Sequence, residues 1–553
     1  MVNAGRLRLA VAALAALVWV GWFSPDIADS DFWWHLRTGR YIWETHSLPV
    51  PDPFAYTTAP ARAGYAGEEL TRHFNLTHEW LSQVLFYQAY GAAGFPGVVL
   101  LRAAVLAMFC GMVAWVVRRR CGGFYRAIAA AFVTAMFAAG FALDRPYIFT
   151  FLSLAVTVAI LESRRAMWVL PVLFLIWANC HGGFFLGWVV LGAYSVEPLV
   201  LRRKDWRLWI IAAAAIVLSG LNPNGYRVLE ILRYYRGSYL TSTLLEWARP
   251  SLWPPGVFTL LVVGAPAVLL WAWRKARVSD WLLWAAFAAA AMTAQRNIIL
   301  IGFVAPMVMA SYLPWKPRVP AWAEYGAVVL LAAALGTGIV RGSFFQLRAA
   351  EWKFPAGAAD FLLAHHVTAP LFNTYEYGGY LIWRLWPQER VFIDGRALSE
   401  SVFMDYGRML YNHEPNGGKS AQQLLDQYGV EVIVMNAFEY ATGNLYLLAP
   451  SLADPQQTAW KLVYSDAAAT IFMRHPPAGV EPMDSMKVFD HLEAECGLHL
   501  ERQPEFPRCA RSLGQVFYRA NDLERARRWI GLYLAHPHDP DPEAERAFQQ
   551  LIR

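Results

Sequence analysis

Long apolar stretches separated by short polar connections dominate the first 340 residues of the chain. A helix that crosses a bilayer needs about 20 predominantly apolar residues, so each stretch predicts a membrane span, although several are short. We expect eleven spans, at residues 7–23, 96–117, 126–142, 146–161, 167–179, 183–200, 207–221, 254–273, 279–294, 297–313 and 320–340. After residue 340 the hydropathy falls, which predicts a soluble C-terminal part.

Basic residues between the apolar stretches predict the orientation of the chain in the membrane. With the N-terminus inside, the alternation of eleven spans places five basic clusters in the cytoplasm, as the positive-inside rule requires: 118–120, 164–165, 202–204, 274–277 and 316–318. Two long polar loops, 24–95 and 222–253, and the C-terminal part then lie outside. Residues 79–90 then form a short amphipathic helix at the outer surface. We interpret the clusters as topology determinants, so no nucleic-acid partner is expected.

The soluble part divides into two predicted regions. Residues 341–480 alternate helical and buried-strand patterns, for instance LFN and VFID around a glycine-containing helix, which predicts a small α/β domain. Asn373 and the DGR sequence at 394–396 stand where two of these strands end and are either ligand groups or turn residues. Residues 481–553 are charged and helical, with spacings typical of a TPR-like repeat that would act as a cap or docking element. The predicted fold class is therefore mainly α: a polytopic transmembrane helical bundle over residues 1–340, a C-terminal soluble α/β domain and a short helical, TPR-like tail.

The composition supports a membrane protein. Of 553 residues, 57% are hydrophobic and 16% are charged, with 25 Trp, 25 Tyr and 32 Phe, which excludes an ordinary soluble enzyme. The five cysteines show no paired metal-ligand spacing. Only Cys496 and Cys509 lie close enough in sequence, in a region expected to be extracytoplasmic, to suggest one disulfide. Two unrelated free thiols are the alternative.

The stretch 24–46, directly after the first apolar segment, combines acids, aromatic side chains, histidine and arginine. Asp29 or Ser30 can cap a short helix, which places Asp31 in the first turn, where the helix dipole favours a carboxylate. At helical spacing His35 lies on the same face as Asp31. The aromatic side chains at the other positions suit the membrane interface. We interpret this stretch as the entrance to an active site; the alternative is an amphipathic helix with solvated acids.

Further polar groups stand at span ends on the same predicted outer side. Such groups are costly unless they line a wet cavity, so we expect the rim of one outward-facing pocket; taken singly, each is explained by capping or snorkelling. Arg145 and Arg296 are each an isolated cation at the outer end of a span, where the positive-inside pattern gives no reason for one. The groups are Asp144–Arg145–Pro146, Asn179–Cys180–His181–Gly182–Gly183 and Gln295–Arg296–Asn297.

Seven short sequences carry a resemblance to a known superfamily: DSDFWWHLRTGRYI, PDPFAYT, HEWLSQVLFY, ANCHGGFFLG, LNPNGY, YGGYLIW and FIDGR. Together with the acid-bearing first loop, the second long loop after the seventh span and the soluble C-terminal part, they resemble the GT-C superfamily. Its members are integral-membrane glycosyltransferases that use polyprenyl-phosphate-linked sugars. The narrower resemblance is to a bacterial GT-C-like group with largely unassigned substrates, and it covers about residues 7–440.

The resemblance implies an enzyme that moves a sugar from a polyprenyl-phosphate donor to a glycan, lipid or protein acceptor. The expected location is the bacterial inner membrane, surrounded by membrane lipid, with the C-terminal part in the periplasm. The acid of the superfamily near the start of the first loop maps onto Asp31, the expected general base, or onto Asp29. Arg296, Arg145 and His181 are the candidates for binding the donor phosphate. The residues expected to contact substrate or acceptor are His35, Trp34, His78, Glu79, Asn179 and Asn222.

Two features of related enzymes are missing from the sequence. The C-terminal part has no WWD-type motif like that of oligosaccharyltransferases, and no clear second acidic pair for a metal, so an oligosaccharyltransferase is disfavoured. The one cofactor considered is a divalent cation, because the carboxylates of Asp29 and Asp31 could together hold a hard cation.

Two other classes of protein stay open on the sequence. A lipid-linked glycan transporter or flippase also needs many spans and polar groups in the membrane, but the paired internal repeats of common transporters are not evident. A membrane scaffold would act through its soluble tail. The long loops on one side of the membrane favour the enzyme.

Overall fold

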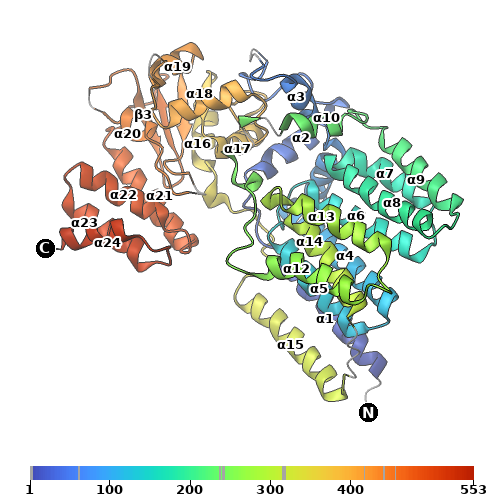
Figure 1. The fold of residues 1–553 in the computed structure, drawn as a ribbon. Coiled ribbons are helices and arrows are strands. Elements are labelled where there is room, and N and C mark those ends of the chain that lie inside the picture. The colour runs from blue at the N-terminus through green and yellow to red at the C-terminus, as the bar shows by residue number, and fades with distance from the viewer. Residues whose placement is uncertain are drawn as a thin grey trace. The chain divides into compact units, whose positions relative to one another are not determined.

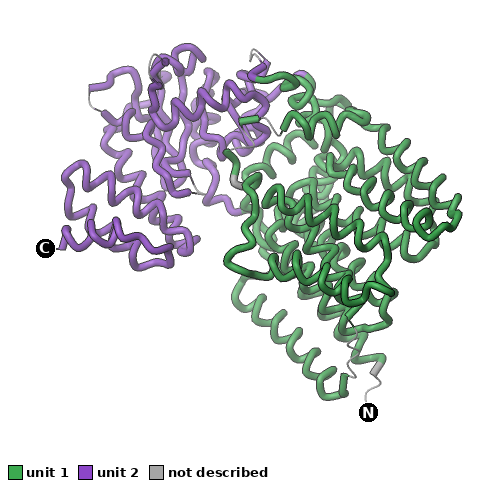
Figure 2. The backbone as a smooth tube through the Cα atoms, viewed as in Figure 1, with its two compact units in different colours: residues 1–50, 65–349 green, residues 51–64, 350–553 purple. Residues whose placement is uncertain are grey.

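The structure is a computed structural model that describes residues 4–59, 63–235, 238–239, 243–313, 319–415, 418–439, 442–454 and 456–552. The chain divides into two compact units (Figure 2): unit 1 comprises residues 1–50 and 65–349, and unit 2 comprises residues 51–64 and 350–553. The segment 51–64 lies inside the first long loop of the sequence, yet it packs with unit 2.

Helices build unit 1, and each of the apolar stretches predicted as spans contains one (Figure 1). They are α1 (Ala4–Trp22), α4 (Trp80–Cys121), α5 (Phe124–Ala139), α6 (Tyr147–Ser163), α7 (Val169–Cys180), α8 (Phe185–Val200), α9 (Trp206–Ser219), α12 (Val257–Trp271), α13 (Val278–Ala291), α14 (Ile298–Tyr312) and α15 (Ala321–Val340). Among the described residues, four helical segments are long and apolar enough to cross a membrane: Gly5–Trp22, Glu68–Cys121, Gly182–Val200 and Ala321–Val340. The mainly helical fold is confirmed, and the number of spans stays a prediction.

Helix α4 is interrupted where the sequence predicts that an amphipathic helix gives way to a span. The backbone leaves the helical conformation at Ala93 and Gly94, where Gly94 has φ +64°, and Pro96 follows. Glycine adopts a positive φ without strain, and proline lacks the N–H of an uninterrupted helix. The two parts of α4 therefore correspond to the predicted amphipathic helix 79–90 and the predicted span 96–117.

Helix α2 (Asp31–Thr45) packs against α4. The approach is close, because a Cβ on Gly39 would lie 2.0 Å from the carbonyl oxygen of Gln83. Phe32 and Trp33, which were expected at the membrane interface, are 0% and 1% exposed. That expectation is wrong because protein encloses the first two turns of α2 on all sides.

A buried ionic network joins α4, α6 and α13 at the ends that the sequence predicts to be cytoplasmic. Arg120 lies 2.8 Å from Glu162 and 3.0 Å from Asp280, and Arg277 lies 2.7 Å from Glu162. Two of the predicted basic clusters thus each contribute one arginine to an internal ion pair. The predicted cluster at 316–318 lies outside the described residues.

Unit 2 contains a four-stranded sheet in the order β1-β2-β4-β3. Its strands are β1 (Leu371–Asn373), β2 (Val432–Met435), β3 (Lys461–Ser465) and β4 (Thr470–Met473). The pair β1 and β2 is parallel, and β4 is antiparallel to both β2 and β3. The helices of this region are η4 (Glu351–Lys353), α16 (Ala356–Ala364), α17 (Tyr375–Leu385), α18 (Glu400–Leu410), α19 (Ala421–Gln427) and α20 (Leu448–Leu452). The predicted combination of helices with a small sheet is confirmed.

Residues 391–394 do not form the predicted strand and make one backbone bridge to the segment 51–64. The side chain of Asn373 makes hydrogen bonds to this segment that the backbone of a neighbouring strand would otherwise make. Its Oδ1 accepts the N–H of Phe392 at 2.9 Å, and its Nδ2 donates to the carbonyl of Ile393 at 2.8 Å. The strand prediction is wrong because an amide side chain satisfies backbone groups that a neighbouring strand would otherwise pair.

Asp52, Asp394 and Arg396 form a buried ionic cluster that fastens the segment 51–64 to the rest of unit 2. Arg396 lies 2.7 Å from Asp52 and 2.7 Å from Asp394, and the three side chains are at most 2% exposed. Asp52 also accepts the backbone N–H of Phe54 at 3.1 Å. Because these charges are paired internally, the structure favours turn residues over ligand groups for the DGR sequence.

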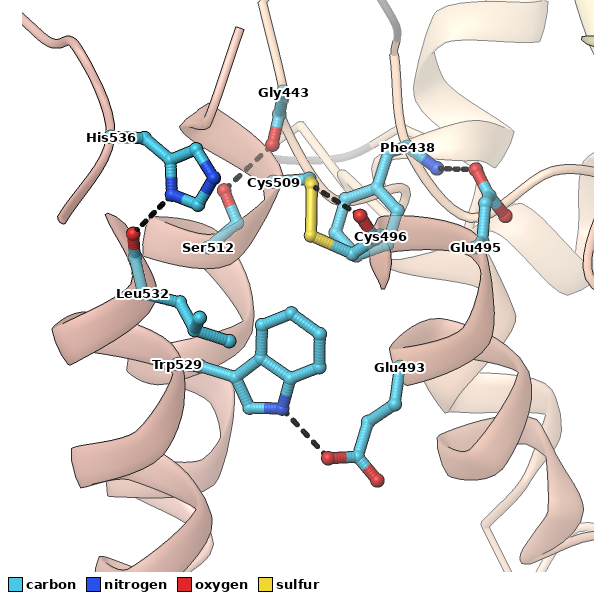
Figure 3. Close-up of a disulfide and its surroundings, with 10 residues drawn as sticks. All are labelled: Phe438, Gly443, Glu493, Glu495, Cys496, Cys509, Ser512, Trp529, Leu532 and His536. Carbon is cyan, nitrogen blue, oxygen red and sulfur yellow. Dashed lines mark hydrogen bonds between the residues drawn. A yellow bond between two sulfur atoms is a disulfide. The ribbon is translucent and has the colours of Figure 1, made fainter. Parts of the chain in front are cut away.

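Four helices end the chain within unit 2: α21 (Lys487–Arg502), α22 (Arg508–Arg519), α23 (Leu523–Ala535) and α24 (Pro542–Leu551). A disulfide between Cys496 and Cys509 links α21 to α22 (Figure 3), so the disulfide is confirmed over two free thiols. On α23, Trp529 donates its indole N–H to Glu493 of α21 at 2.7 Å. These helices share one buried core with the sheet, and their TPR-like assignment stays a prediction.

Candidate functional site

A cluster of ionisable side chains forms in unit 1 where helix ends and loops meet. It is built from the start of α2, the start of α4, the turn before α6, the end of α7, and the short turns η2 (Leu245–Trp247) and η3 (Gln295–Asn297). The helices α3 (Glu68–Thr77) and α10 (Val228–Tyr235) end beside it. We call this group the polar cluster; its members are Asp29, Asp31, His35, His78, Glu79, Arg145, His181, Glu246 and Arg296.

Arg145, in the turn before α6, holds both candidate acids. Its Nε and Nη2 atoms lie 2.5 and 2.8 Å from the two carboxylate oxygens of Asp29, and Nη2 lies 2.9 Å from Asp31 Oδ2. Asp29 also accepts the backbone N–H of Asp31 at 3.2 Å, whereas Ser30 makes no side-chain cap. Of the two predicted caps of α2, Asp29 is therefore the one in use.

The shared guanidinium leaves the two carboxyls with different pKa values. Burial opposes the ionisation of Asp29, but the charge and hydrogen bonds of Arg145 outweigh it and lower the pKa. For Asp31 burial dominates, and it raises the pKa to about 6 although Arg145 acts in the opposite direction. Both carboxyls are ionised at neutral pH, and the pKa of Asp31 lies closer to the range in which a general base is most effective.

Neither arginine of the site is the isolated cation that the sequence suggested. Arg296 lies 3.3 Å from one carboxylate oxygen of Glu246, and Arg145 lies 3.8 Å from the other. The guanidinium of Arg296 also stacks over the ring of Trp247 at 4.7 Å. Glu246 comes from the second long loop, so the sequence around either arginine gives no sign of this partner.

Glu79 is surrounded by three imidazoles. One of its carboxylate oxygens lies 3.2 Å from His78 Nε2 and 3.7 Å from His181 Nε2. The other oxygen lies 3.8 Å from His35 Nδ1. The Glu79 side chain is 11% exposed, so its charge is largely shielded from water. The structure thus brings together four residues that the sequence analysis named separately.

Hydrogen bonds fix the tautomer of His181. Its Nδ1 accepts the backbone N–H of Gly183 at 3.0 Å and lies 2.9 Å from the hydroxyl of Thr150. A ring nitrogen that accepts an N–H carries no proton, so neutral His181 holds its proton on Nε2. His181 therefore presents an N–H donor to the polar cluster, on the side of Glu79.

His35 and Trp34 are buried behind the acids on α2. Burial lowers the pKa of His35 to about 4, so its imidazole is neutral at pH 7. Gln83 Nε2 lies 3.3 Å from His35 Nδ1. Trp34 is 6% exposed, which leaves little of its surface for a substrate.

The two predicted asparagines are engaged inside the protein. Asn179 donates to two backbone carbonyls at 2.9 Å and accepts the indole N–H of Trp80 at 2.7 Å. Asn222 donates to two carbonyls of its own turn at 2.7 and 2.9 Å and accepts the N–H of Asn224. Because their amides are satisfied internally, these residues support the loops around the site and are not members of the polar cluster.

Asp29 and Asp31 do not form an open cation site in this arrangement. Within the described ranges, no group of three or more His, Cys, Asp or Glu side chains is arranged to hold a metal ion. Arg145 bridges both carboxylates and supplies the positive charge that a divalent cation would bring. The pair fits an arginine-bridged site better than a metal site.

The sequence analysis missed Glu246 and Tyr235. Tyr235 donates its hydroxyl proton to Asn75, and its ring lies 5.8 Å from that of Trp247. Glu246 is one of only two acids in the loop 222–253, which is a signal that could have identified it.

No protein-family model matches the chain, and no curated protein matches it. Several solved structures match the chain. The Archaeoglobus fulgidus oligosaccharyltransferase in its apo form matches with a TM-score of 0.53 at 12% identity, over 88% of this chain and 78% of that chain. ArnT from Cupriavidus metallidurans in the apo state gives a TM-score of 0.46 at 14% identity, over 85% and 97% of the two chains. ArnT bound to undecaprenyl phosphate gives 0.40 at 12% identity, over 86% and 99%.

At 12% identity, the match to the oligosaccharyltransferase shows a shared fold and nothing further. The match to the oligosaccharyltransferase at 0.53 is sufficient for the fold. The chain therefore shares the fold of this oligosaccharyltransferase, in agreement with the fold that the sequence resemblance implies.

Proposed function

We propose that the protein is a membrane glycosyltransferase that moves a sugar from a polyprenyl-phosphate donor to an acceptor on the outer face of the membrane. The fold shared with an oligosaccharyltransferase supports this class of reaction. The observation that carries the assignment is the carboxylate pair Asp29 and Asp31, bridged by Arg145, with the guanidinium of Arg296 in the same polar cluster.

Asp31 is the general base of the proposed reaction. The acceptor oxygen or nitrogen forms a bond to the anomeric carbon, the bond from that carbon to the phosphate breaks, and the acceptor proton passes to Asp31. The carboxylate of Asp31 is 13% exposed and has a pKa of about 6, whereas Asp29 is held by two bonds to Arg145 and is 6% exposed. Asp29 is therefore the positioning residue, which fixes Arg145 and caps α2.

Arg296 stabilises the leaving lipid phosphate. Its guanidinium lies over the ring of Trp247 and its side chain is 36% exposed, so its N–H groups can reach phosphate oxygens. The Nε2–H of His181 is a second, neutral donor for the same charge. Both groups act more strongly on the leaving phosphate than on the bound donor, because the charge on the phosphate grows as the bond breaks.

The proposed orientation places unit 2 in the periplasm of a bacterial cell. The disulfide between Cys496 and Cys509 supports an oxidising compartment, since such bonds are rare in the cytosol. The basic clusters at 118–120 and 202–204 support the same orientation through the positive-inside rule.

Transfer from a polyprenyl-phosphate sugar in reconstituted vesicles tests the proposal. Asp31→Asn should lose about 10² to 10⁴ fold in turnover, because it cannot take a proton, and should still bind undecaprenyl phosphate at least as well as the parent. The matched control is Asp26→Asn, which removes an acid from the same loop outside the polar cluster.

Two outcomes would contradict the proposal. Transfer at the parental rate by Asp31→Asn would exclude Asp31 as the base. A parent protein that transfers no sugar from any polyprenyl-phosphate donor, yet moves lipid across the vesicle membrane, would be a transporter.

A further inference from the structure

The polar cluster already carries more negative than positive charge before any donor binds. It contains four carboxylates and two guanidiniums: Asp29, Asp31, Glu79 and Glu246, with Arg145 and Arg296. Both guanidiniums are paired with carboxylates. A lipid phosphate adds at least one further negative charge, so it can bind these guanidiniums only where a carboxylate gives way.

Burial decides which carboxylate can leave. The side chains of Asp29 and Asp31 are 6% and 13% exposed, and each would have to break a shielded ion pair with Arg145. The side chain of Glu79 is 11% exposed and contacts imidazoles, so its departure would free neither guanidinium. Glu246 is 43% exposed. Exposed ion pairs contribute little to stability, whereas removing a partner from a buried pair costs several times more. Glu246 is therefore the one of the four that exchanges its partners for water at little cost.

The position of Glu246 also matches the requirement for a phosphate. One of its oxygens lies 3.3 Å from Arg296 Nη1 and the other 3.8 Å from Arg145 Nη1, so the carboxylate spans both guanidiniums. Two oxygens of a phosphate can span two guanidiniums in the same way, with shorter and stronger charge-assisted hydrogen bonds.

The backbone next to Glu246 is held independently of its side chain. The N–H of Gln295 donates to the carbonyl of Ala248 at 2.8 Å, and Trp247 stacks on Arg296 at 4.7 Å. Rotation of the Glu246 side chain alone is therefore enough to free the two guanidiniums.

We propose that the Glu246 carboxylate occupies the donor-phosphate subsite when no donor is bound, and that the phosphate displaces it. This inference rests on the proposed function, in which Arg296 and Arg145 bind the lipid phosphate. Glu246 thus sets the affinity for the donor by competition, and it also prevents the two guanidiniums from repelling each other in the empty site.

The test is the affinity of the full-length protein, in phosphatidylcholine nanodiscs, for undecaprenyl phosphate and for undecaprenol. Glu246→Gln removes the competing charge and should lower the Kd for undecaprenyl phosphate about two- to five-fold, the equivalent of an exposed ion pair. The Kd for undecaprenol, which has no phosphate, should not change. Glu246→Asp, whose shorter side chain draws the carboxylate back, should shift the Kd in the same direction.

Glu230→Gln is the matched control, because it removes an exposed acid from the same loop. The carboxylate of Glu230 accepts a hydrogen bond from Tyr234 and not from an arginine. Glu230→Gln should bind undecaprenyl phosphate as the parent does. If Glu230→Gln and Glu246→Gln gained affinity for undecaprenyl phosphate equally, the gain would come from the net charge of the loop, and the inference would be overturned.

Arg296→Ala separates the two levels of the proposal. If Arg296→Ala weakens binding of undecaprenyl phosphate while Glu246→Gln leaves it unchanged or weakens it, the donor site stands and the role of Glu246 is overturned. If Arg296→Ala and the parent both bind undecaprenyl phosphate no better than undecaprenol, the proposed function fails together with this inference.

Discussion

Asp31 Oδ2 lies 2.9 Å from Arg145 Nη2, and this ion pair sets the charge state of the proposed base. Burial raises the pKa of Asp31 to about 6, and the guanidinium charge keeps it from rising further. The ion pair thus keeps a largely buried carboxyl ionised at neutral pH.

The pH dependence of transfer follows from this relationship. In the parent, kcat/KM should rise with pH through a midpoint near 6, because only ionised Asp31 accepts a proton. In Arg145→Gln the midpoint should move to higher pH, since the charge that lowers the pKa is gone. The pH profile is compared with that of Arg249→Gln, which removes an exposed arginine. A midpoint that stays near 6 in Arg145→Gln would show that Arg145 does not set the pKa of Asp31.

Asp29→Asn should destabilise unit 1 by about 3 kcal/mol at pH 7, the lower end for a broken buried ion pair, because Arg145 keeps its contact with Asp31. The measurement is Tm in detergent. The pKa of Asp29 is lowered in the folded state, so its stabilising effect is present above the unfolded value near 4 and is lost as the pH falls through the folded pKa. The difference in Tm between parent and variant should therefore shrink in acid, and a difference that grew in acid would contradict the assignment.

The disulfide should be closed in protein isolated without reductant. Alkylation of the denatured protein should then modify only Cys110, Cys121 and Cys180, and two further thiols should react after reduction. Cys496→Ala with Cys509→Ala should destabilise unit 2 by about 3 kcal/mol, because the bond closes a short loop with a separation of 13 residues. Cys121→Ser is the control, because it removes a cysteine whose thiol is free and should leave the stability of unit 2 unchanged. Five thiols that react before reduction would rule out the bond.

The orientation is testable by labelling introduced cysteines in intact cells. Ser47→Cys and Ala478→Cys lie at exposed positions that are predicted to be outside, so a membrane-impermeant maleimide should reach both. Lys204→Cys lies in a basic cluster predicted to be cytoplasmic and should react only after permeabilisation. Labelling of Lys204→Cys in intact cells, with Ser47→Cys protected, would reverse the orientation.

The helices of unit 1 were predictable because their signal is local. Each span is a run of apolar residues, and the break in α4 at Gly94 is marked by Gly94 and Pro96 in the sequence. The strand expected at 391–394 failed because the decisive group is the side chain of Asn373, which is distant in sequence. A pattern of hydrophobic residues does not indicate which polar side chain will replace the backbone hydrogen bonds between two strands.

The candidate site was predictable as a set of acids and arginines, but its pairing was not. The sequence could not separate Asp29 from Asp31, because two acids two residues apart differ only in what reaches them across the fold. Arg145 makes that difference. The scarcity of acids in the loop 222–253 marks Glu246 as a candidate, but its pairing with two arginines from other helix ends could not be predicted.

The buried pair of Asp52 and Arg396 has a consequence for how the protein is made. The two residues are 344 positions apart, so at 5–20 residues per second Asp52 leaves the ribosome about 20 to 70 s before its partner exists. During that time the segment 51–64 has no finished unit 2 to join. A chain that stops near residue 350 never completes the pair. C-terminal truncation therefore leaves Asp52 without Arg396 and the segment 51–64 without the unit it packs in, rather than an intact membrane part.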